Sequence, residues 1–143
     1  MSGIRETPAR TSRVLVCGGR DYSDRDHIWN TLCKLDHERG PFKVVIHGCA
    51  TGADSEAMIW AQTCDRKHAP FQADWHKHGR AAGPIRNQRM LDEGKPDLVI
   101  AFPGGTGTAD MIRKARAAGV EVVKVERSEY DPALGVKLAD ATP

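Results

Sequence analysis

A glycine-rich turn at residues 103–108 is the stretch of this chain whose composition points most directly to chemistry. Its sequence, PGGTGT, follows an apolar run at 98–102 and precedes a helix-like run that begins near Ala109. Glycines let backbone N–H groups approach a phosphate closely, and the positive end of a helix dipole favours negative charge there. The turn therefore predicts a binding site for a phosphate-bearing ligand.

Two further glycine turns follow apolar runs, at residues 18–21 (GGRD) and 47–54 (HGCATGAD). A short loop between a strand and a helix often needs glycine for its geometry alone, so one such turn is ambiguous. Three turns of this kind favour ligand binding. None of them matches the Walker pattern for triphosphates, and the ordinary dinucleotide fingerprint does not follow the first strand.

Polar and aromatic side chains upstream of residues 103–108 could contact the same ligand. Arg86 and Asn87 open a predicted helix after residues 83–84. An arginine can form two parallel hydrogen bonds to a phosphate, and Asn87 could hold a ribose or a base edge. The alternative for both is a solvated helix face. Trp75 could stack on a base or pack at the edge of the core.

Three aspartates, Asp21, Asp54 and Asp110, stand beside glycine turns. Each could be a favourable charge at a helix N-terminus or could bind a ribose hydroxyl. The basic cluster at residues 113–116 is expected on a solvated helix face, away from the glycine turns.

The histidines and cysteines predict no metal centre. His76 and His78 lack a third ligand nearby in the sequence, which favours a surface loop. Cysteines occur at positions 17, 33, 49 and 64 without a recognisable metal spacing, so buried free thiols are expected. A reactive Cys49 at a helix N-terminus is the alternative. No cofactor is predicted.

The bulk composition fits one ordinary globular domain. The chain has 143 residues, 40% hydrophobic and 28% charged, and a formal net charge of +2. That charge suits a small anionic ligand better than nucleic acid, which calls for a clustered basic face. A secretory signal is not visible, and no apolar run approaches the roughly 20 residues of a membrane helix, so a cytoplasmic protein is expected.

Apolar runs predict strands at residues 13–17, 43–47, 69–73, 97–102 and 120–125. Periodicity and capping residues predict helices at 24–38, 53–67 and 84–93, and from Thr106 or Thr108 to Gly119, with a polar loop at 76–83. This alternation predicts an α/β fold, a Rossmann-like open, mostly parallel sheet of about five strands with helices on both faces. Ligands in such folds bind at the carboxyl ends of the strands, where all three glycine turns lie.

The predicted organisation has three parts. Residues 1–12 form a flexible N-terminal segment, residues 13–126 form the domain, and residues 127–143 form a C-terminal tail or short helix.

The segments 14–21, 47–54, 83–90 and 97–108 together resemble the YspA/cpYpsA-related family of the SLOG superfamily. The resemblance covers roughly residues 13–125 and every glycine turn in order. It implies a Rossmann-like fold and binding of nucleotides or nucleotide-derived ligands, including in signalling and conflict systems.

Two relatives in this superfamily imply further activities. The Lonely Guy enzymes hydrolyse nucleoside monophosphates to a base and ribose phosphate, and Arg86 and residues 103–108 are similar to their pattern. Their glutamate, however, is replaced here by Met111, with Asp110 one residue earlier. Residues 86–87 also resemble the Arg-Asn element of DNA-processing protein A, which binds single-stranded DNA.

The sequence therefore predicts a module that senses or sequesters a nucleotide-type ligand. The alternatives are an N-glycosidic hydrolase acting on a nucleoside monophosphate or an ADP-ribose-type ligand, with Arg86, Asp110 and Asp21 as catalytic candidates, and a module that binds single-stranded DNA. A membrane partner is not expected, and a homo-oligomer is left open. The predicted ligand-binding residues are Gly18, Gly19, Arg20, Gly48, Thr51, Gly52, Asp54, Asp74, Trp75, Arg80, Arg86, Asn87, Gly104, Gly105, Thr106, Gly107 and Thr108.

Overall fold

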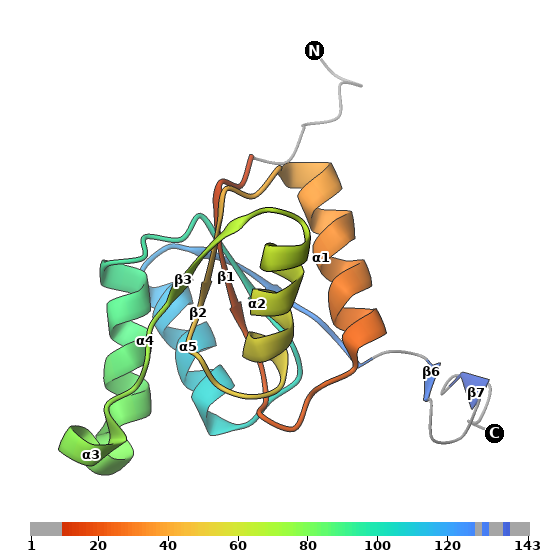
Figure 1. Ribbon diagram of the computed structural model, residues 1–143. Coiled ribbons are helices and arrows are strands. Elements are labelled where there is room, and N and C mark those ends of the chain that lie inside the picture. Colours follow the sequence, from red (N-terminus) through yellow and green to blue (C-terminus); the bar gives the residue numbers. More distant parts are fainter. Residues whose placement is uncertain (1–9, 128–129, 132–135, 138–143) are drawn as a thin grey trace.

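The computed structural model describes residues 10–127, 130–131 and 136–137, and centres on one parallel sheet (Figure 1). The sheet has the order β3-β2-β1-β4-β5. Its strands are β1 (Arg13–Cys17), β2 (Val44–His47), β3 (Lys67–Pro70), β4 (Leu98–Ala101) and β5 (Glu121–Lys124). The helices are α1 (Arg25–Arg39), α2 (Ala53–Thr63), α3 (Trp75–His78), α4 (Ala82–Asp92) and α5 (Thr106–Ala117), with a 3-10 turn at Gly79–Ala81. This architecture confirms the predicted Rossmann-like α/β fold.

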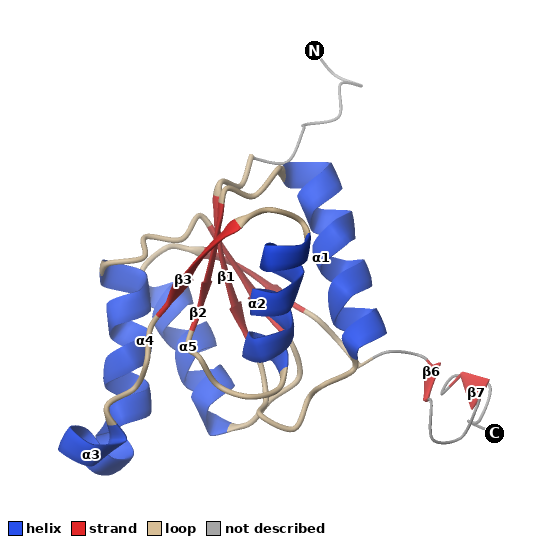
Figure 2. Ribbon diagram, in the orientation of Figure 1, coloured by secondary structure: helices blue, strands red, loops and turns tan. Residues whose placement is uncertain are grey.

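The helices cover the sheet in two layers (Figure 2). Helices α1 and α2 lie on one face, where Ile28, Leu32 and Trp60 pack with Val14 and Val16 of β1. Helices α4 and α5 lie on the other face, where Met90 and Met111 are part of a second core cluster with Leu15 and Cys17. Because successive strand residues point to opposite faces, the run 14–17 supplies both cores at once.

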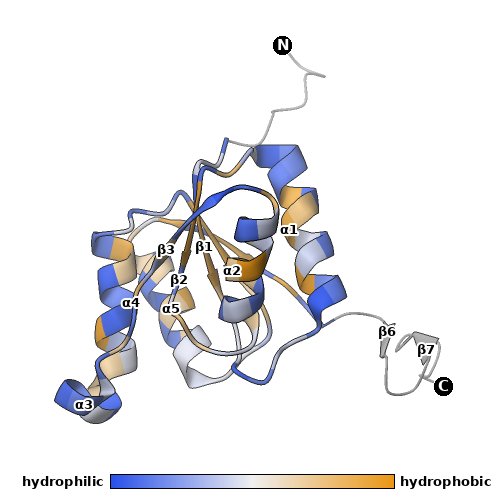
Figure 3. Ribbon diagram, viewed as in Figure 1, coloured by the Kyte–Doolittle hydropathy of each residue, from blue (hydrophilic) through white to orange (hydrophobic). Residues whose placement is uncertain are grey.

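The central strands are the most apolar part of the chain, whereas β3 at the sheet edge is largely hydrophilic (Figure 3). All four residues of β4 are buried, but the two end residues of β3, Lys67 and Pro70, are exposed. Pro70 has no N–H to donate, so an edge strand is a position that accommodates it.

Most predicted elements agree with the structure to within two residues, but the segment around β3 does not. Helix α2 ends at Thr63 instead of residue 67, and Asp65 adopts a left-handed φ of 57° as the chain turns. The strand predicted at 69–73 consequently begins earlier, at Lys67. The polar sequence at 63–67 contains no glycine or proline, so no residue there signalled the end of the predicted helix.

The polar loop predicted at 76–83 is wrong, because this segment is helical. The Asp74 side chain caps α3 by accepting a hydrogen bond of 3.0 Å from the Lys77 N–H. Helix α4 then begins at Ala82, two residues before Pro84. A short helix rich in lysine and histidine has no apolar stripe, so periodicity could not reveal it.

The terminal segments are described only in part. Of the predicted segment 1–12, residues 1–9 lie outside the described residues, and Thr11 is buried with its N–H donating to the Arg39 carbonyl at 2.7 Å. Of the predicted tail 127–143, Tyr130–Asp131 and Val136–Lys137 form a two-stranded antiparallel pair, and 128–129, 132–135 and 138–143 lie outside. None of the helices within the described ranges has the length and apolar character needed to cross a membrane.

Candidate functional site

The loops that leave β1 and β4 meet at the point where the strand order reverses. Strand β1 leads to the α1 face and β4 leads to the α5 face, an arrangement that opens a crevice at the carboxyl ends. The Gly19 N–H donates to the Pro103 carbonyl at 2.8 Å and ties the two loops together. A Cβ at Gly19 would lie 3.1 Å from both Gly104 Cα and the Pro103 oxygen, so this close approach favours glycine.

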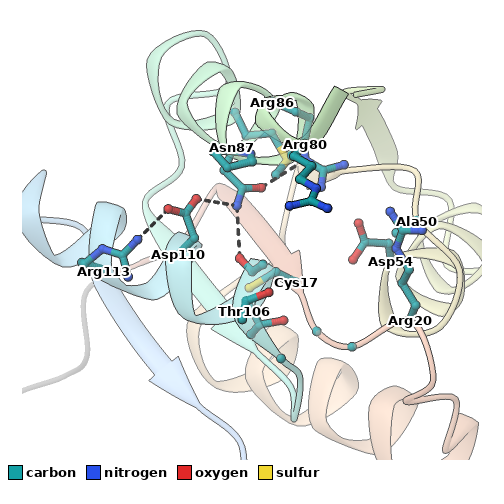
Figure 4. Close-up of a pocket in the computed structure, with 18 of the residues that line it drawn as sticks. Cys17, Arg20, Ala50, Asp54, Arg80, Arg86, Asn87, Thr106, Asp110 and Arg113 are labelled. Atoms are coloured by element: carbon teal, nitrogen blue, oxygen red, sulfur yellow. Dashed lines mark hydrogen bonds and ion pairs between the residues drawn. The ribbon is translucent and has the colours of Figure 1, made fainter. Parts of the chain in front are cut away.

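A cavity of about 580 Å³ occupies this crevice (Figure 4). That volume lies in the range of small-molecule sites. Of the predicted site residues, it is lined by Gly18, Gly19, Arg20, Asp54, Trp75, Arg80, Arg86, Asn87, Gly105, Thr106, Gly107, Thr108 and Asp110.

The remaining predicted residues lie elsewhere. Gly48 and Thr51 line an adjoining cavity of about 280 Å³, and Asp21 and Gly104 line a third of about 700 Å³ beside β5. Gly52 lines none of these three cavities. Its φ of 74° and the contact that a Cβ would make with the Gly19 oxygen give it a structural role. Asp74 likewise serves as the cap of α3.

Arg86, Gly48 and Asp54 form one linked group beneath the cavity. Arg86 Nη1 donates to the Gly48 carbonyl at 2.6 Å, and the Gly48 N–H donates to Asp54 Oδ2 at 2.8 Å. Burial raises the pKa of Asp54 to about 6, although the Gly48 N–H and the Arg86 charge oppose the shift. Burial also lowers the pKa of Arg86. Asp54 is therefore a carboxyl group able to exchange a proton near neutral pH.

Asn87 and Asp110 join α4 to α5 at the other side of the cavity. Asn87 Nδ2 donates to the Gly107 carbonyl at 3.1 Å and to Asp110 Oδ2 at 3.0 Å (Figure 4). Asp110 also accepts hydrogen bonds from Arg113 and Lys114, each at 2.8 Å. Burial would raise the pKa of Asp110, but the hydrogen bonds from Lys114 and Asn87 outweigh it and lower the pKa. This carboxylate is held as an anion that positions Asn87.

Trp75 and Arg20 meet at the cavity mouth. The Trp75 side chain is 48% exposed, and the Arg20 guanidinium carbon lies 5.2 Å from the centre of its ring. An exposed indole beneath a cation offers a stacking surface for an aromatic ligand.

Sequence reasoning missed Arg113, which lines the cavity although its cluster was expected on a distant solvated face. The sequence signal that could have placed Arg113 near Asp110 was helical spacing. Arg113 and Lys114 lie three and four residues after Asp110 on α5, which brings their side chains to the same face. Lys114 also donates to the Pro84 carbonyl at 2.9 Å.

The cysteines near the cavity are not activated. Burial raises the pKa of the Cys17 thiol and, less strongly, that of Cys49, and the Asp54 charge acts in the same direction on both. Thiols with raised pKa values are poor nucleophiles, which counts against the reactive Cys49 alternative. Among the described residues, histidine, cysteine and carboxylate side chains form no group of three that could hold a metal ion.

The strand order defines a Rossmann-like domain, and its cavity lies at the switch point of the sheet. The model of the YspA, cpYpsA-related SLOG family matches residues 12–78. The chain is 39% identical over 119 residues to the Gene 61 protein of Mycobacterium phage D29, covering 78% of this chain and 94% of that protein. It therefore belongs to the YspA, cpYpsA-related SLOG family, as its motifs predict.

Solved structures share the fold at low identity. The X-ray structure of TM1055 aligns with a TM-score of 0.57 and 19% identity, covering 77% of this chain and 72% of that chain. This likeness supports the Rossmann-like fold. DNA processing protein A from Streptococcus pneumoniae aligns with a TM-score of 0.45 and 16% identity, covering 78% of this chain and 58% of that chain.

Proposed function

We propose that the protein binds a nucleotide or nucleotide-derived ligand in the switch-point cavity, as a sensor or sequestering module. The observation that carries the proposal is that four arginines and the uncapped N-terminus of α5 line the same cavity. Gly105 at the cap position offers no side-chain acceptor, so the first-turn N–H groups of α5 are available to an anion. Arg20, Arg80, Arg86 and Arg113 line the same cavity and supply positive charge.

A small ligand accounts for this geometry better than single-stranded DNA. A DNA-binding surface needs basic side chains that follow a groove, together with successive aromatic platforms. Here the arginines surround one cavity, and Trp75 is the aromatic side chain that lines it. A cytoplasmic location stays a prediction from the sequence.

An N-glycosidic hydrolase is the second candidate, and Asp54 is the observation that favours it. Cleavage of a glycosidic bond needs a carboxylate near the sugar or the attacking water. Asp110 is engaged by three donors and Asp21 lines a different cavity, whereas Asp54 lines the main cavity with a pKa of about 6. We therefore place the catalytic carboxylate of this alternative at Asp54.

The test combines calorimetric titration with chromatography of each mixture, using nucleoside monophosphates, nucleoside diphosphates and ADP-ribose. Arg86→Ala should weaken phosphate-dependent binding at least about tenfold, because a hydrogen bond to a charged group contributes about 1.5–3 kcal/mol. Arg89→Ala is the matched control on the same helix. Arg89 pairs with Glu93 at 3.0 Å and lines none of the three cavities around the switch point.

Arg86→Lys, which keeps the charge, checks that any loss does not come from an unfolded variant. Equal affinities for wild-type protein and Arg86→Ala would contradict the proposed site. Recovery of an intact ligand supports a sensor, whereas release of the base supports the hydrolase, and Asp54→Asn should then abolish release.

A further inference from the structure

The main cavity lies next to the cavity of about 280 Å³, and the two share Arg20, Ala50, Trp75 and Arg86 as lining residues. The border between them is therefore made of two guanidinium groups, an indole and a methyl group. The smaller cavity is completed by short or uncharged side chains at Gly48, Cys49, Thr51, Gln72 and Ala73.

The charge at this border is unbalanced. Arg20 and Arg86 each act on the buried Asp54 carboxyl, and the Arg20 charge also lowers the pKa of Arg86. Figure 4 shows the Asp54 carboxyl group between the Arg20 and Arg86 side chains. Two guanidinium groups that share one carboxylate leave a net positive charge at the border, which attracts a bound anion.

A nucleoside monophosphate would fill only one of the two cavities. It has one organic arm, so a phosphate at the border would leave one of the two cavities to solvent. A pyrophosphate carries a charge on each phosphoryl group and an organic arm at either end. Two guanidinium groups suit such a bridge, because each can form paired hydrogen bonds to phosphate oxygens.

We propose that the ligand is a two-armed nucleotide, in which a pyrophosphate joins a nucleoside to a second sugar or nucleoside. The pyrophosphate lies at Arg20 and Arg86, the base and its ribose occupy the main cavity beside Trp75, and the second arm enters the cavity at Gln72 and Thr51. This inference rests on the proposed function and narrows it to one substrate class.

The test compares binding of AMP, ADP, ADP-ribose and diadenosine pyrophosphate by calorimetric titration, with the uridine and guanosine counterparts of each. The two-armed compounds should bind at least about tenfold more tightly than the diphosphate of the same nucleoside. ADP-ribose and diadenosine pyrophosphate distinguish a sugar from a nucleoside as the second arm.

Gln72→Trp places a large side chain in the smaller cavity and should reduce that preference to about onefold. Thr51→Trp blocks the same cavity from a second position. Gln88→Trp is the matched control, because Gln88 is exposed on α4 and bonds to Asp92 away from both cavities.

Equal affinity for ADP and the two-armed compounds would overturn this inference but leave the proposed function intact. A preference that survives both tryptophan variants would also overturn it. If none of the nucleotides binds, the proposed function itself fails.

Discussion

Asp54 is an acidic residue that is buried in the wall of the main cavity. Its carboxyl group is 5% exposed and lies at the N-terminus of α2. Its pKa rises from the ordinary 3.8 to about 6 in the folded protein, so the folded state binds more protons than the unfolded state between these values. The contribution of Asp54 to stability is thus fully present below pH 4 and is lost as the pH rises through 6.

Asp54→Asn should remove this dependence. The unfolding free energy of the wild type relative to the variant should fall by at most about 1.4 kcal/mol per pH unit between pH 4 and 6, and then level off. Urea unfolding at a series of pH values measures it. Asp26→Asn, at an exposed position in the first turn of α1, controls for the loss of a charge. A relative free energy that stays constant from pH 4 to 7 would contradict the burial argument.

Single residues were predictable from the sequence where a side chain stands next to a glycine turn. Arg20, Arg86 and Asn87 line the cavity, and their contact with a ligand stays a prediction. The sequence could not show that Asp110 accepts a hydrogen bond from Asn87, because these two residues lie 23 positions apart on different helices. The sequence also could not show that Asp21 lies outside the main cavity, since this depends on the side of the loop to which its side chain points.

Gly107 is a residue of helix α5 that lowers the stability of the helix and also lines the cavity. It lies in the first turn of α5, where a Cβ would meet no other atom within 4 Å. Glycine in a helix costs about 0.5–1 kcal/mol relative to alanine. Gly107 is also one of the residues that line the cavity.

Gly107→Ala should therefore raise the melting temperature of the free protein while weakening nucleotide binding. Thermal unfolding with and without ligand measures both effects. The control is Gly119→Ala, where a φ of 77° makes an alanine strained and destabilising without touching the cavity. A variant at Gly107 that is stabilised and binds with unchanged affinity would remove the α5 N-terminus from the site.

Elements with strong apolar patterns were predictable, and those defined by capping were not. Strands β1, β2 and β4 contain the continuous apolar runs 14–17, 44–46 and 98–101, as buried parallel strands require. Helix α3 depends on one aspartate cap and has no buried residue, so its only sequence signal was Asp74 three residues before Lys77. The end of α2 depends on a left-handed residue, Asp65, which tolerates this conformation without being glycine.

At the scale of the whole molecule, the cavity draws on both helix layers. Its lining includes Asp54 from the α1–α2 layer and Asn87 and Gly107 from the α4–α5 layer. The amino ends of the strands lie at the opposite end of the sheet, where residues 41–44 and 65–67 line a separate pocket.

A bound nucleotide should consequently slow amide hydrogen exchange in both helix layers, but only at the end of the sheet where the carboxyl ends of the strands lie. We expect added protection at residues 18–20, 50–54 and 105–108, and little at 41–44. Peptide-resolved exchange mass spectrometry measures the pattern, at ligand concentrations about a hundredfold above Kd. At that concentration, binding to the folded state alone should stabilise the whole protein by about 2.7 kcal/mol. Protection confined to one layer would argue against a ligand held at the switch point.

The positions of the tryptophans give the molecule an optical probe of its own. Of the three in the chain, Trp60 is buried in the apolar core, Trp29 is partly buried against that core, and Trp75 stands half exposed at the cavity mouth. A ligand that replaces Arg20 on the Trp75 ring would quench the red-edge emission of that one indole. The emission of Trp29 and Trp60, which line none of the three cavities around the switch point, would remain as an internal reference, so occupancy of the cavity can be followed in unlabelled protein.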